Sequence, residues 1–129
     1  MTYHLFLDDE RSPVNVTWMT LPDVPWHIVR NYEEFTEMVI TKGAPLSVSF
    51  DHDLADEHYA AMLRETNNER NVDYGPEMTG YECAKWLVYF CEANRLKFPD
   101  YTVHSMNPIG AKRIHDFIAE AKKHLLIMR

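Results

Sequence analysis

Residues 3–10, Tyr-His-Leu-Phe-Leu-Asp-Asp-Glu, and residues 46–53, Leu-Ser-Val-Ser-Phe-Asp-His-Asp, repeat one pattern. Each stretch begins as a short run rich in β-forming side chains and ends abruptly in acids. A buried strand that leads into a functional loop has this pattern. The two stretches therefore predict strands at 3–8 and 46–50, each followed by a loop with polar chemistry.

Further strands and helices are predicted around this pair. Residues 26–30 and 101–104 have the composition of short strands. Asn31 can cap a helix that ends at Gly43. Thr79 can cap a second helix, whose apolar side chains repeat at helical spacing as far as residue 96. A third helix is predicted to follow the last strand and to end near residue 126.

Two segments are predicted to lack regular structure for most of their length. The connection 9–25 contains Pro13, Pro22 and Pro25, which remove backbone donors and oppose a continuous helix. Residues 54–78 are polar and irregular, with a helical piece near 56–64, and are predicted to form a loop that covers the functional site.

Strands that alternate with helices predict a parallel sheet in an α/β fold. The carboxyl ends of parallel strands share one edge of the sheet, and ligands bind at that edge. Asp8, Asp51 and His104 each follow a predicted strand. We therefore expect these three residues to lie close together, although they are far apart in the sequence.

The size and composition of the chain limit its functions. Its 129 residues fit a single domain, and 46% hydrophobic residues supply one core. The formal net charge of -7 disfavours the broad basic surface that binds long duplex DNA. Cys83 and Cys91 lie on one predicted helix, roughly 12 Å apart, too far for a disulfide. No leader or membrane-spanning run is recognised, so a cytoplasmic location is expected.

The acids at the predicted edge indicate a divalent cation. Asp8 and Asp9 lie together, and Asp51 and Asp53 project from a neighbouring strand end. Carboxylates this close repel one another and have raised pKa values unless a cation neutralises them. Oxygen ligands suit Mg²⁺, Mn²⁺ or Ca²⁺, with Mg²⁺ or Mn²⁺ the first expectation. The alternative is that some of these acids cap turns or face solvent.

His52 and His104 are the two histidines predicted at this edge. An imidazole titrates near neutrality, so it can act as a general base, a general acid or a hydrogen-bond donor to phosphate. Two imidazoles on opposite sides of a phosphorus atom suit the cleavage of a cyclic phosphodiester. A purely structural role is the alternative for each, and it is the expectation for the other histidines of the chain.

A phosphate-binding side is predicted next to the last helix. Ser105 and Asn107 precede its first turn, where backbone amides and the helix dipole favour an anion, and Lys112 adds charge. Asn107 also suits the helix cap. Arg11 can bind phosphate, although an ion pair with Glu10 is the favoured alternative.

Aromatic residues offer a weaker signal for a nucleobase. Trp18, Trp26, Tyr59 and Tyr74 can stack on a base, but such residues are also common in cores and at their rims. Glycine-rich phosphate loops, metal-binding cysteine pairs and the serine-hydrolase elbow are not found in the sequence. Nucleoside triphosphatase and dehydrogenase functions are therefore disfavoured.

Four blocks of sequence carry a resemblance to a known family. They are residues 5–13 (Leu-Phe-Leu-Asp-Asp-Glu-Arg-Ser-Pro), 50–54 (Phe-Asp-His-Asp-Leu), 79–80 (Thr-Gly) and 103–108 (Val-His-Ser-Met-Asn-Pro). In this order they resemble the cyclic-phosphate-processing receiver-like domains of phages and bacteria, which are related to response-regulator receivers. The resemblance spans nearly the whole chain. It implies a compact receiver-like (flavodoxin-like) three-layer sandwich, with a mainly parallel sheet of about four strands in the order 2-1-3-4.

The resemblance also implies roles for particular residues. Asp8 and Asp9 match the acidic pair that holds Mg²⁺ in receivers, Asp51 matches the phosphoacceptor position, and Ser105 matches the hydroxyl residue. The chain departs from receivers because it has no recognisable fifth strand with its lysine, and the proline-bearing connection 9–25 replaces the first helix. His52, Asp53 and His104 are additions that suit hydrolysis.

Together these signals predict a metal-dependent phosphoesterase that acts on a cyclic phosphate, either a 2′,3′-cyclic RNA end or a cyclic nucleotide. Asp51, His52 and His104 are its expected catalytic residues. A phosphoacceptor signalling module and a non-catalytic protein that binds a cyclic nucleotide or a protein partner are the alternatives. If a phage encodes the chain, the expected location is the host cytoplasm.

Overall fold

The computed structural model describes residues 2–53 and 79–128 of the chain. Its strands are β1 (His4–Leu7), β2 (Trp26–Val29), β3 (Ser47–Phe50) and β4 (Asp100–Val103). Its helices are the short 3-10 helix η1 (Pro13–Asn15), α1 (Tyr32–Lys42), α3 (Gly80–Ala93) and α4 (Pro108–Met128). The loop and helical piece predicted within 54–78 lie outside the described residues. None of the described helices is long and apolar enough to cross a membrane.

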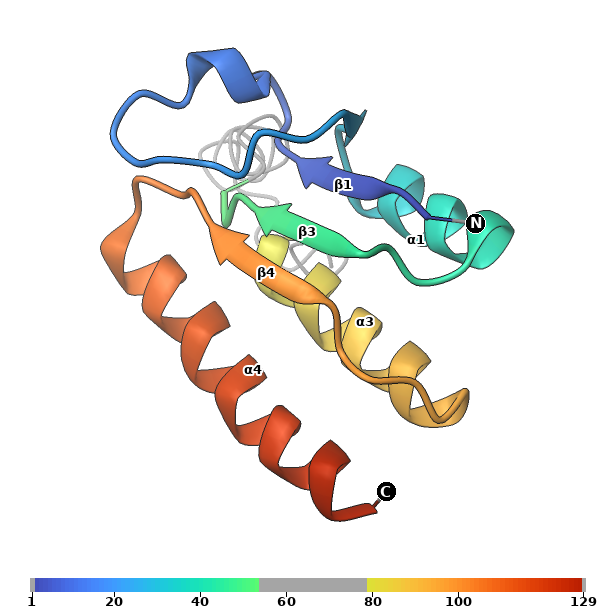
Figure 1. Ribbon diagram of the computed structural model, residues 1–129. Helices are drawn as coiled ribbons and strands as arrows, with labels where there is room; N and C mark the ends of the chain where they lie inside the picture. Colours follow the sequence, from blue (N-terminus) through green and yellow to red (C-terminus); the bar gives the residue numbers. More distant parts are fainter. Residues whose placement is uncertain (1, 54–78, 129) are drawn as a thin grey trace, which may run out of the picture.

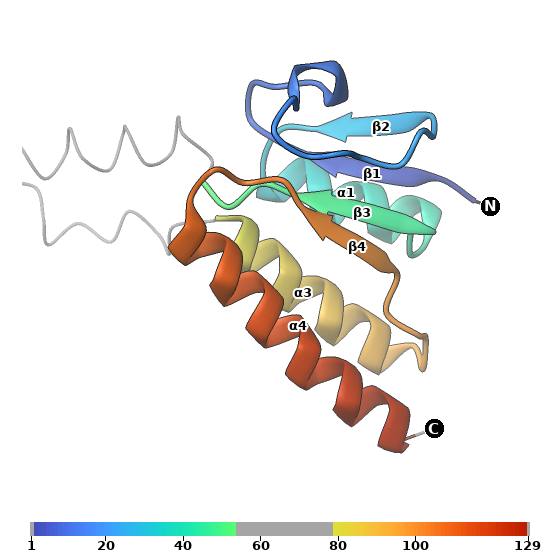
Figure 2. The same ribbon diagram turned by 60° about the vertical axis from the view of Figure 1, so that its left-hand side comes forward.

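The sheet has the predicted order, β2-β1-β3-β4, and all of its neighbouring strands are parallel. The arrows of β1, β3 and β4 point the same way in Figure 1, and Figure 2 shows β2 beside β1 with the same direction. The last residues of three strands are in register, because Leu7 pairs with Phe50 and Phe50 pairs with Val103. The residues that follow them, Asp8, Asp51 and His104, therefore leave the sheet at one edge, as the sequence predicted.

One face of the sheet packs against the three α-helices. Leu5, Leu7 and Phe50 from the strands join Phe35 of α1 and Leu87 of α3 in one hydrophobic core, all with no exposed surface. The core also takes Ile114 and Ile118 from α4, and Figure 2 shows α3 and α4 running side by side. Cys83 and Cys91 are buried in it and are not joined to each other by a disulfide, as predicted.

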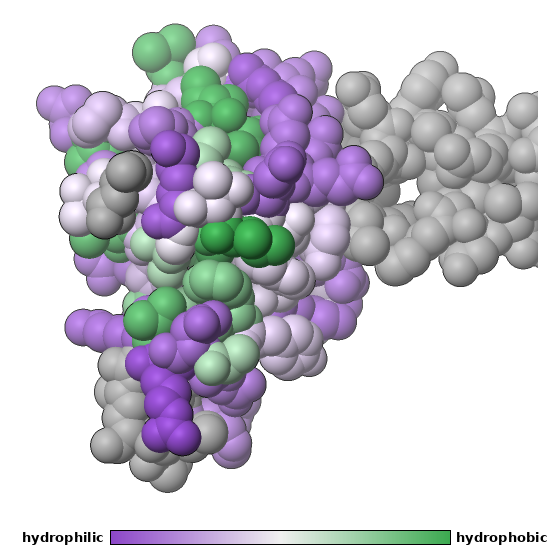
Figure 3. All heavy atoms as spheres, turned by 90° about the vertical axis from the view of Figure 1, so that its right-hand side faces the viewer, coloured by the Kyte–Doolittle hydropathy of each residue, from purple (hydrophilic) through white to green (hydrophobic). Residues whose placement is uncertain are grey.

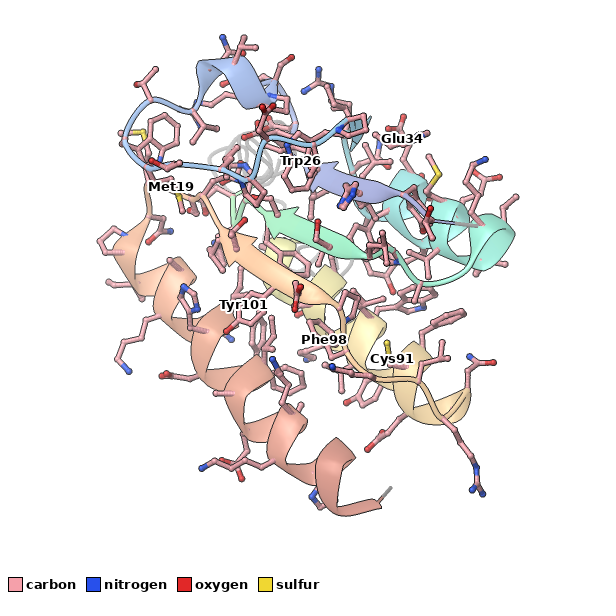
Figure 4. The ribbon with its side chains drawn as sticks, in the orientation of Figure 1. Met19, Trp26, Glu34, Cys91, Phe98 and Tyr101 are labelled. Carbon is pink, nitrogen blue, oxygen red and sulfur yellow. The ribbon has the colours of Figure 1, made fainter. Side chains whose placement is uncertain are left out.

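The opposite face of the sheet has a different cover. Phe6 is fully buried there, with its ring stacked on His104 at 4.4 Å and against Trp26 at 6.0 Å. Figure 4 shows Trp26 beside β1. The connection 9–25 lies on this side and contributes the buried Val16, and its described helix is the three-residue η1 (Figure 1). A loop therefore replaces the helical layer of a receiver here, as the prolines predicted.

The helix starts follow the predicted caps. The side chain of Asn31 accepts a hydrogen bond from the amide of Glu34, and Thr79 accepts one from the amide of Tyr81. Gly43 ends α1 at a φ of 87°, a backbone region that favours glycine.

Figure 3 shows the surface on the side where the strands begin. Hydrophobic residues (green) are interspersed there with hydrophilic residues (purple).

Gly80 allows α3 to begin directly against the end of β3. Its amide donates to the carbonyl of His52 at 2.7 Å. A Cβ atom on Gly80 would lie 1.6 Å from the carbonyl oxygen of Asp51, which is backbone and cannot move aside cheaply. The absence of a side chain at this position thus sets how closely the helix approaches the acidic edge.

Gly80→Ala is expected to destabilise the protein by about 1–3 kcal/mol, because the added methyl overpacks a rigid contact. Helix propensity alone predicts the opposite sign, a gain of up to about 1 kcal/mol. Urea denaturation of the two proteins measures the difference, with Thr79→Ala as a neighbouring variant that loses only a cap. A stabilised Gly80→Ala protein would contradict the close approach of α3.

Candidate functional site

Asp8 is a buried acid held by several hydrogen bonds. It has no exposed surface. Its Oδ1 accepts the backbone amides of Glu10 at 3.0 Å and Arg11 at 2.8 Å, and its Oδ2 lies 3.0 Å from Nε2 of His104. Burial by itself raises the pKa of Asp8, but these hydrogen bonds outweigh it and hold the pKa below its ordinary value. Asp8 is therefore an ionised carboxylate at neutral pH.

Asp51 has the opposite electrostatic setting. It is 4% exposed, and its Oδ1 accepts a hydrogen bond from the amide of His52 at 2.9 Å. Burial, followed by the nearby charges of Asp8, Asp9 and Asp53, raises the pKa of Asp51 from 3.8 to about 7. The pKa values of the two buried acids therefore differ, because that of Asp8 is lowered and that of Asp51 is strongly raised.

Asp8, Asp51 and His104 form one compact group of donor atoms. One carboxylate oxygen from each aspartate and one ring nitrogen of His104 lie within 4.8 Å of one another, and all three side chains are buried. Two carboxylates with an imidazole beside them are a donor set that fits Mg²⁺, Mn²⁺ or a similar divalent cation. The raised pKa of Asp51 fits the same view, since a cation would relieve the repulsion that raises it.

The ring and the backbone carbonyl of His104 are both fixed by contacts. Its Nδ1 lies 2.8 Å from Oγ of Ser49, its ring stacks on Phe6, and its carbonyl accepts Nε1 of Trp18 at 2.9 Å. Ser49 is itself fully buried in β3. The sequence predicted His104 at this edge, but it did not predict the contact with Ser49.

His52, Asp53 and Asn107 form a second chain of polar contacts. Nδ1 of His52 lies 2.9 Å from Oδ1 of Asp53, and Nδ2 of Asn107 donates to both oxygens of Asp53, at 3.1 and 3.3 Å. Oδ1 of Asn107 accepts the amide of Gly110, which confirms Asn107 as the cap of α4. Gly110 also makes room for His52, because a Cβ there would lie 2.3 Å from the imidazole ring.

The remaining predicted site residues are placed as follows. Oγ of Ser105 accepts the amide of Asn107 at 3.0 Å. Asp9 is half-buried, and its charge contributes to the raised pKa of Asp51. Arg11 pairs with Asp8 at 4.0 Å rather than with Glu10 as expected. The exposed Lys112 pairs with Asp116 one turn further along α4, at 2.7 Å.

Two contributors were missed at the sequence level. Ser49 interrupts the apolar strand β3 on the face opposite the main core, a pattern that signals a buried polar contact without naming its partner. Arg30 follows β2 and donates through Nη1 to the carbonyls of Asp8 at 3.0 Å and Arg11 at 2.7 Å. Arg30 therefore fixes the backbone of the first acidic loop.

Comparison with models of known protein families matches residues 3–120 to the cyclic-phosphate processing receiver domain. No curated protein and no solved structure gives a significant match. The matched range includes both acidic loops, the whole sheet and most of α4.

The raised pKa of Asp51 predicts how stability depends on pH. Because its folded pKa of about 7 exceeds its ordinary 3.8, the stability it contributes is complete below about pH 4 and is lost as the pH rises through 7. In the presence of EDTA, Asp51→Asn should therefore be more stable than the parent at pH 8, by roughly 2–4 kcal/mol, and the gain should vanish near pH 4.

Urea denaturation at both pH values measures this gain, with the exposed Asp23→Asn as the control that should change little. A gain for Asp51→Asn that is equal at pH 4 and pH 8 would contradict the raised pKa.

Proposed function

The chain belongs to the cyclic-phosphate processing receiver family, and on that premise we propose that it is a metal-dependent phosphoesterase that opens a cyclic phosphate. The buried group of Asp8, Asp51 and His104 carries the proposal. A buried acidic pair is costly for a purely structural protein, because both charges are removed from water. The binding of a cation and a phosphate would offset this cost, because the cation neutralises the two carboxylates.

Asp8 and Asp51 are the residues proposed to hold Mg²⁺ or Mn²⁺, with Asp9 and Asp53 adding negative charge nearby. When bound, such an ion polarises a phosphoryl oxygen and promotes ionisation of water. Asp51 must be ionised to bind it, and its pKa of about 7 makes cation binding strongly pH-dependent in the neutral range.

We assign the proton transfers first to His52. Asp53 lies against Nδ1 of His52 and is itself bound by Asn107, so these contacts orient the imidazole ring. A base must accept the proton of the attacking water, and an acid must give a proton to the ring oxygen that leaves phosphorus. His104 is the second imidazole available, but both of its nitrogens already contact Asp8 and Ser49.

Phosphate binding is proposed for Ser105, Asn107 and Arg11. Ser105 and Asn107 lie at the N-terminus of α4, where the helix dipole favours an anion. Arg11 brings a partly exposed guanidinium beside Asp8. The pairing of Lys112 with Asp116 makes Lys112 the weaker candidate of the set.

The rim of the site offers a surface for a nucleobase. Trp18 is 38% exposed and is attached to the site by its bond to the carbonyl of His104. The guanidinium of Arg11 lies 5.1 Å from its ring, and Arg11 also contacts Met106. Trp26, by contrast, packs against His4 at the start of the strands. These contacts support Trp18 as the stacking residue and a nucleoside cyclic phosphate or RNA end as the substrate.

A receiver-type phosphoacceptor is the second candidate, because Asp51 follows β3 as a phosphoacceptor does and lies beside Asp8 and Asp9. Against it, the described residues after β4 form the single helix α4, without a fifth strand to carry the receiver lysine. Incubation with a small phosphodonor and Mg²⁺ tests it. One acid-labile phosphate that is lost in Asp51→Asn would favour this candidate over the esterase.

The esterase proposal predicts turnover of nucleoside 2′,3′- or 3′,5′-cyclic phosphates with Mg²⁺ or Mn²⁺, followed by phosphorus NMR. His52→Gln should lower kcat by about 10²–10⁴-fold, because a positioned acid or base is lost. His27→Gln, an exposed histidine on β2, is the matched control and should keep full activity. Absence of turnover with every member of the panel, or full activity of His52→Gln, would refute the proposal.

Stacking on Trp18 predicts a preference for substrates that carry a base. Trp18→Leu should raise the KM for a nucleoside 2′,3′-cyclic phosphate by roughly 5- to 150-fold, since base stacking contributes about 1–3 kcal/mol. The KM for glycerol 1,2-cyclic phosphate, which has no base, should stay within about twofold. Trp26→Leu serves as the control. Equal changes for both substrates would argue that Trp18 acts only through the fold.

A further inference from the structure

We propose that Ser49 and Thr102 fix the ring of His104 as the tautomer that carries its proton on Nε2, so that His104 donates to Asp8 and orients it. On this proposal His104 is a positioning residue for the cation site and not a ligand of the cation. The inference rests on the proposed function only for the identity of what Asp8 binds.

The proposal is carried by a continuous chain of hydrogen bonds beneath the site. Oγ1 of Thr102 donates to Oγ of Ser49 at 2.7 Å, and Oγ of Ser49 lies 2.8 Å from Nδ1 of His104. Nε2 of His104 then lies 3.0 Å from Oδ2 of Asp8. The chain thus runs from β4 through β3 to the acid that follows β1.

The direction of donation along this chain follows from its two ends. An ionised carboxylate can only accept, so the proton between His104 and Asp8 belongs to Nε2 of the imidazole. At the other end, Ser49 accepts the hydroxyl proton of Thr102, which leaves its own proton for Nδ1 of His104. Nδ1 is then an acceptor, and the ring is the Nε2–H tautomer. A proton on Nδ1 would instead make Nδ1 the donor to Ser49, and the hydroxyl proton of Ser49 would lose this acceptor.

Burial makes this arrangement hard to exchange for another. Ser49, His104 and Asp8 have no exposed surface. The His104 ring is stacked on Phe6 with an angle of 7° between their planes, and the indole of Trp18 holds its carbonyl. A flipped ring would leave buried donors and acceptors unpaired.

The hydrogen bonds of Asp8 also define how it can bind a cation. A carboxylate has about four lone-pair positions, two on each oxygen. Oδ1 of Asp8 accepts two backbone amides, and Oδ2 accepts His104, so one position on Oδ2 remains for a cation. Asp8 would therefore bind through Oδ2 alone, aimed by His104. Such supporting contacts commonly change metal affinity by about 10- to 100-fold.

Nitrogen-15 NMR of the histidine ring tests the assignment directly. In the metal-free protein at pH 7, His104 should give the shifts of a neutral ring protonated at Nε2. After saturation with Mg²⁺, and separately with Zn²⁺, which readily binds imidazole, Nε2 should still carry its proton. A ring protonated at Nδ1, a doubly protonated ring, or loss of the Nε2 proton on adding either metal would overturn the proposal.

Variants of Ser49 and Thr102 distinguish a hydrogen-bonding role of these residues from a role in packing alone. Ser49→Ala should weaken Mg²⁺ binding, measured by calorimetry, by about 10-fold and change the ring shifts of His104. Ser47→Ala is a matched control, because Ser47 lies on the same strand and contacts another histidine, with His4 Nδ1 at 2.7 Å. Thr102→Val should act in the same direction as Ser49→Ala, and Thr102→Ser should restore the parent values. Equal Mg²⁺ affinities for the Ser49 and Ser47 variants would refute the chain.

Failure of this inference and failure of the proposed function can be told apart. The predicted ring shifts together with no turnover of any cyclic phosphate would leave the positioning chain in place and remove the esterase. Turnover with a metal-bound His104 would do the reverse. Thr102→Val keeps the test usable if Ser49→Ala does not fold, since Thr102 is only half-buried.

Discussion

The site depends on the register of three parallel strands. Leu7, Phe50 and Val103 are aligned across the sheet, so the residues that follow them are forced to one edge. Two of those residues are acids that repel each other in a buried environment. The fold resolves the repulsion unevenly, since hydrogen bonds stabilise the charge of Asp8 while the pKa of Asp51 is raised to about 7. A buried pair of this kind could hold a cation, as the proposed function requires.

The loop 9–25, which replaces a receiver helix, and the hydrogen-bonded chain from Thr102 through Ser49 to His104 lie on the same face of the sheet. A loop covers the second face of the sheet, and Ser49 and Thr102 lie on that face. If a helix packed there instead, hydrophobic side chains would be favoured at these two positions. They connect to His104 instead. The same loop brings Trp18 to the carbonyl of His104 and Arg11 to Asp8. The replacement of a helix by the loop 9–25 therefore affects both the hydrogen bonds beneath His104 and the residues Trp18 and Arg11 at the edge of the site.

Much of this arrangement could be predicted from the sequence, because it depends on local patterns. Strand runs ending in acids, capped helices and their alternation lead to the parallel sheet and to its functional edge. The pairing of Asp53 with His52, the contact of Ser49 with His104 and the bonds of Arg30 to the first loop could not be predicted. The contacts of Ser49 and Arg30 depend on distances between segments far apart in the chain, and the pairing of Asp53 with His52 depends on the directions of two neighbouring side chains. No short-range pattern encodes either. The shared location of the two acidic clusters could be predicted, but the unequal pKa values of Asp8 and Asp51 depend on the burial and hydrogen bonds of each acid.

The central claim is that the edge formed by the three strand ends binds a divalent cation. Paramagnetic Mn²⁺ tests it through the broadening of assigned backbone resonances. At substoichiometric Mn²⁺ the signals of Asp8, Asp51 and His104 should disappear first, and excess Mg²⁺ should restore them. Broadening that instead follows the exposed acids Glu33 and Glu34 of α1, or that spreads evenly over the protein, would contradict the account.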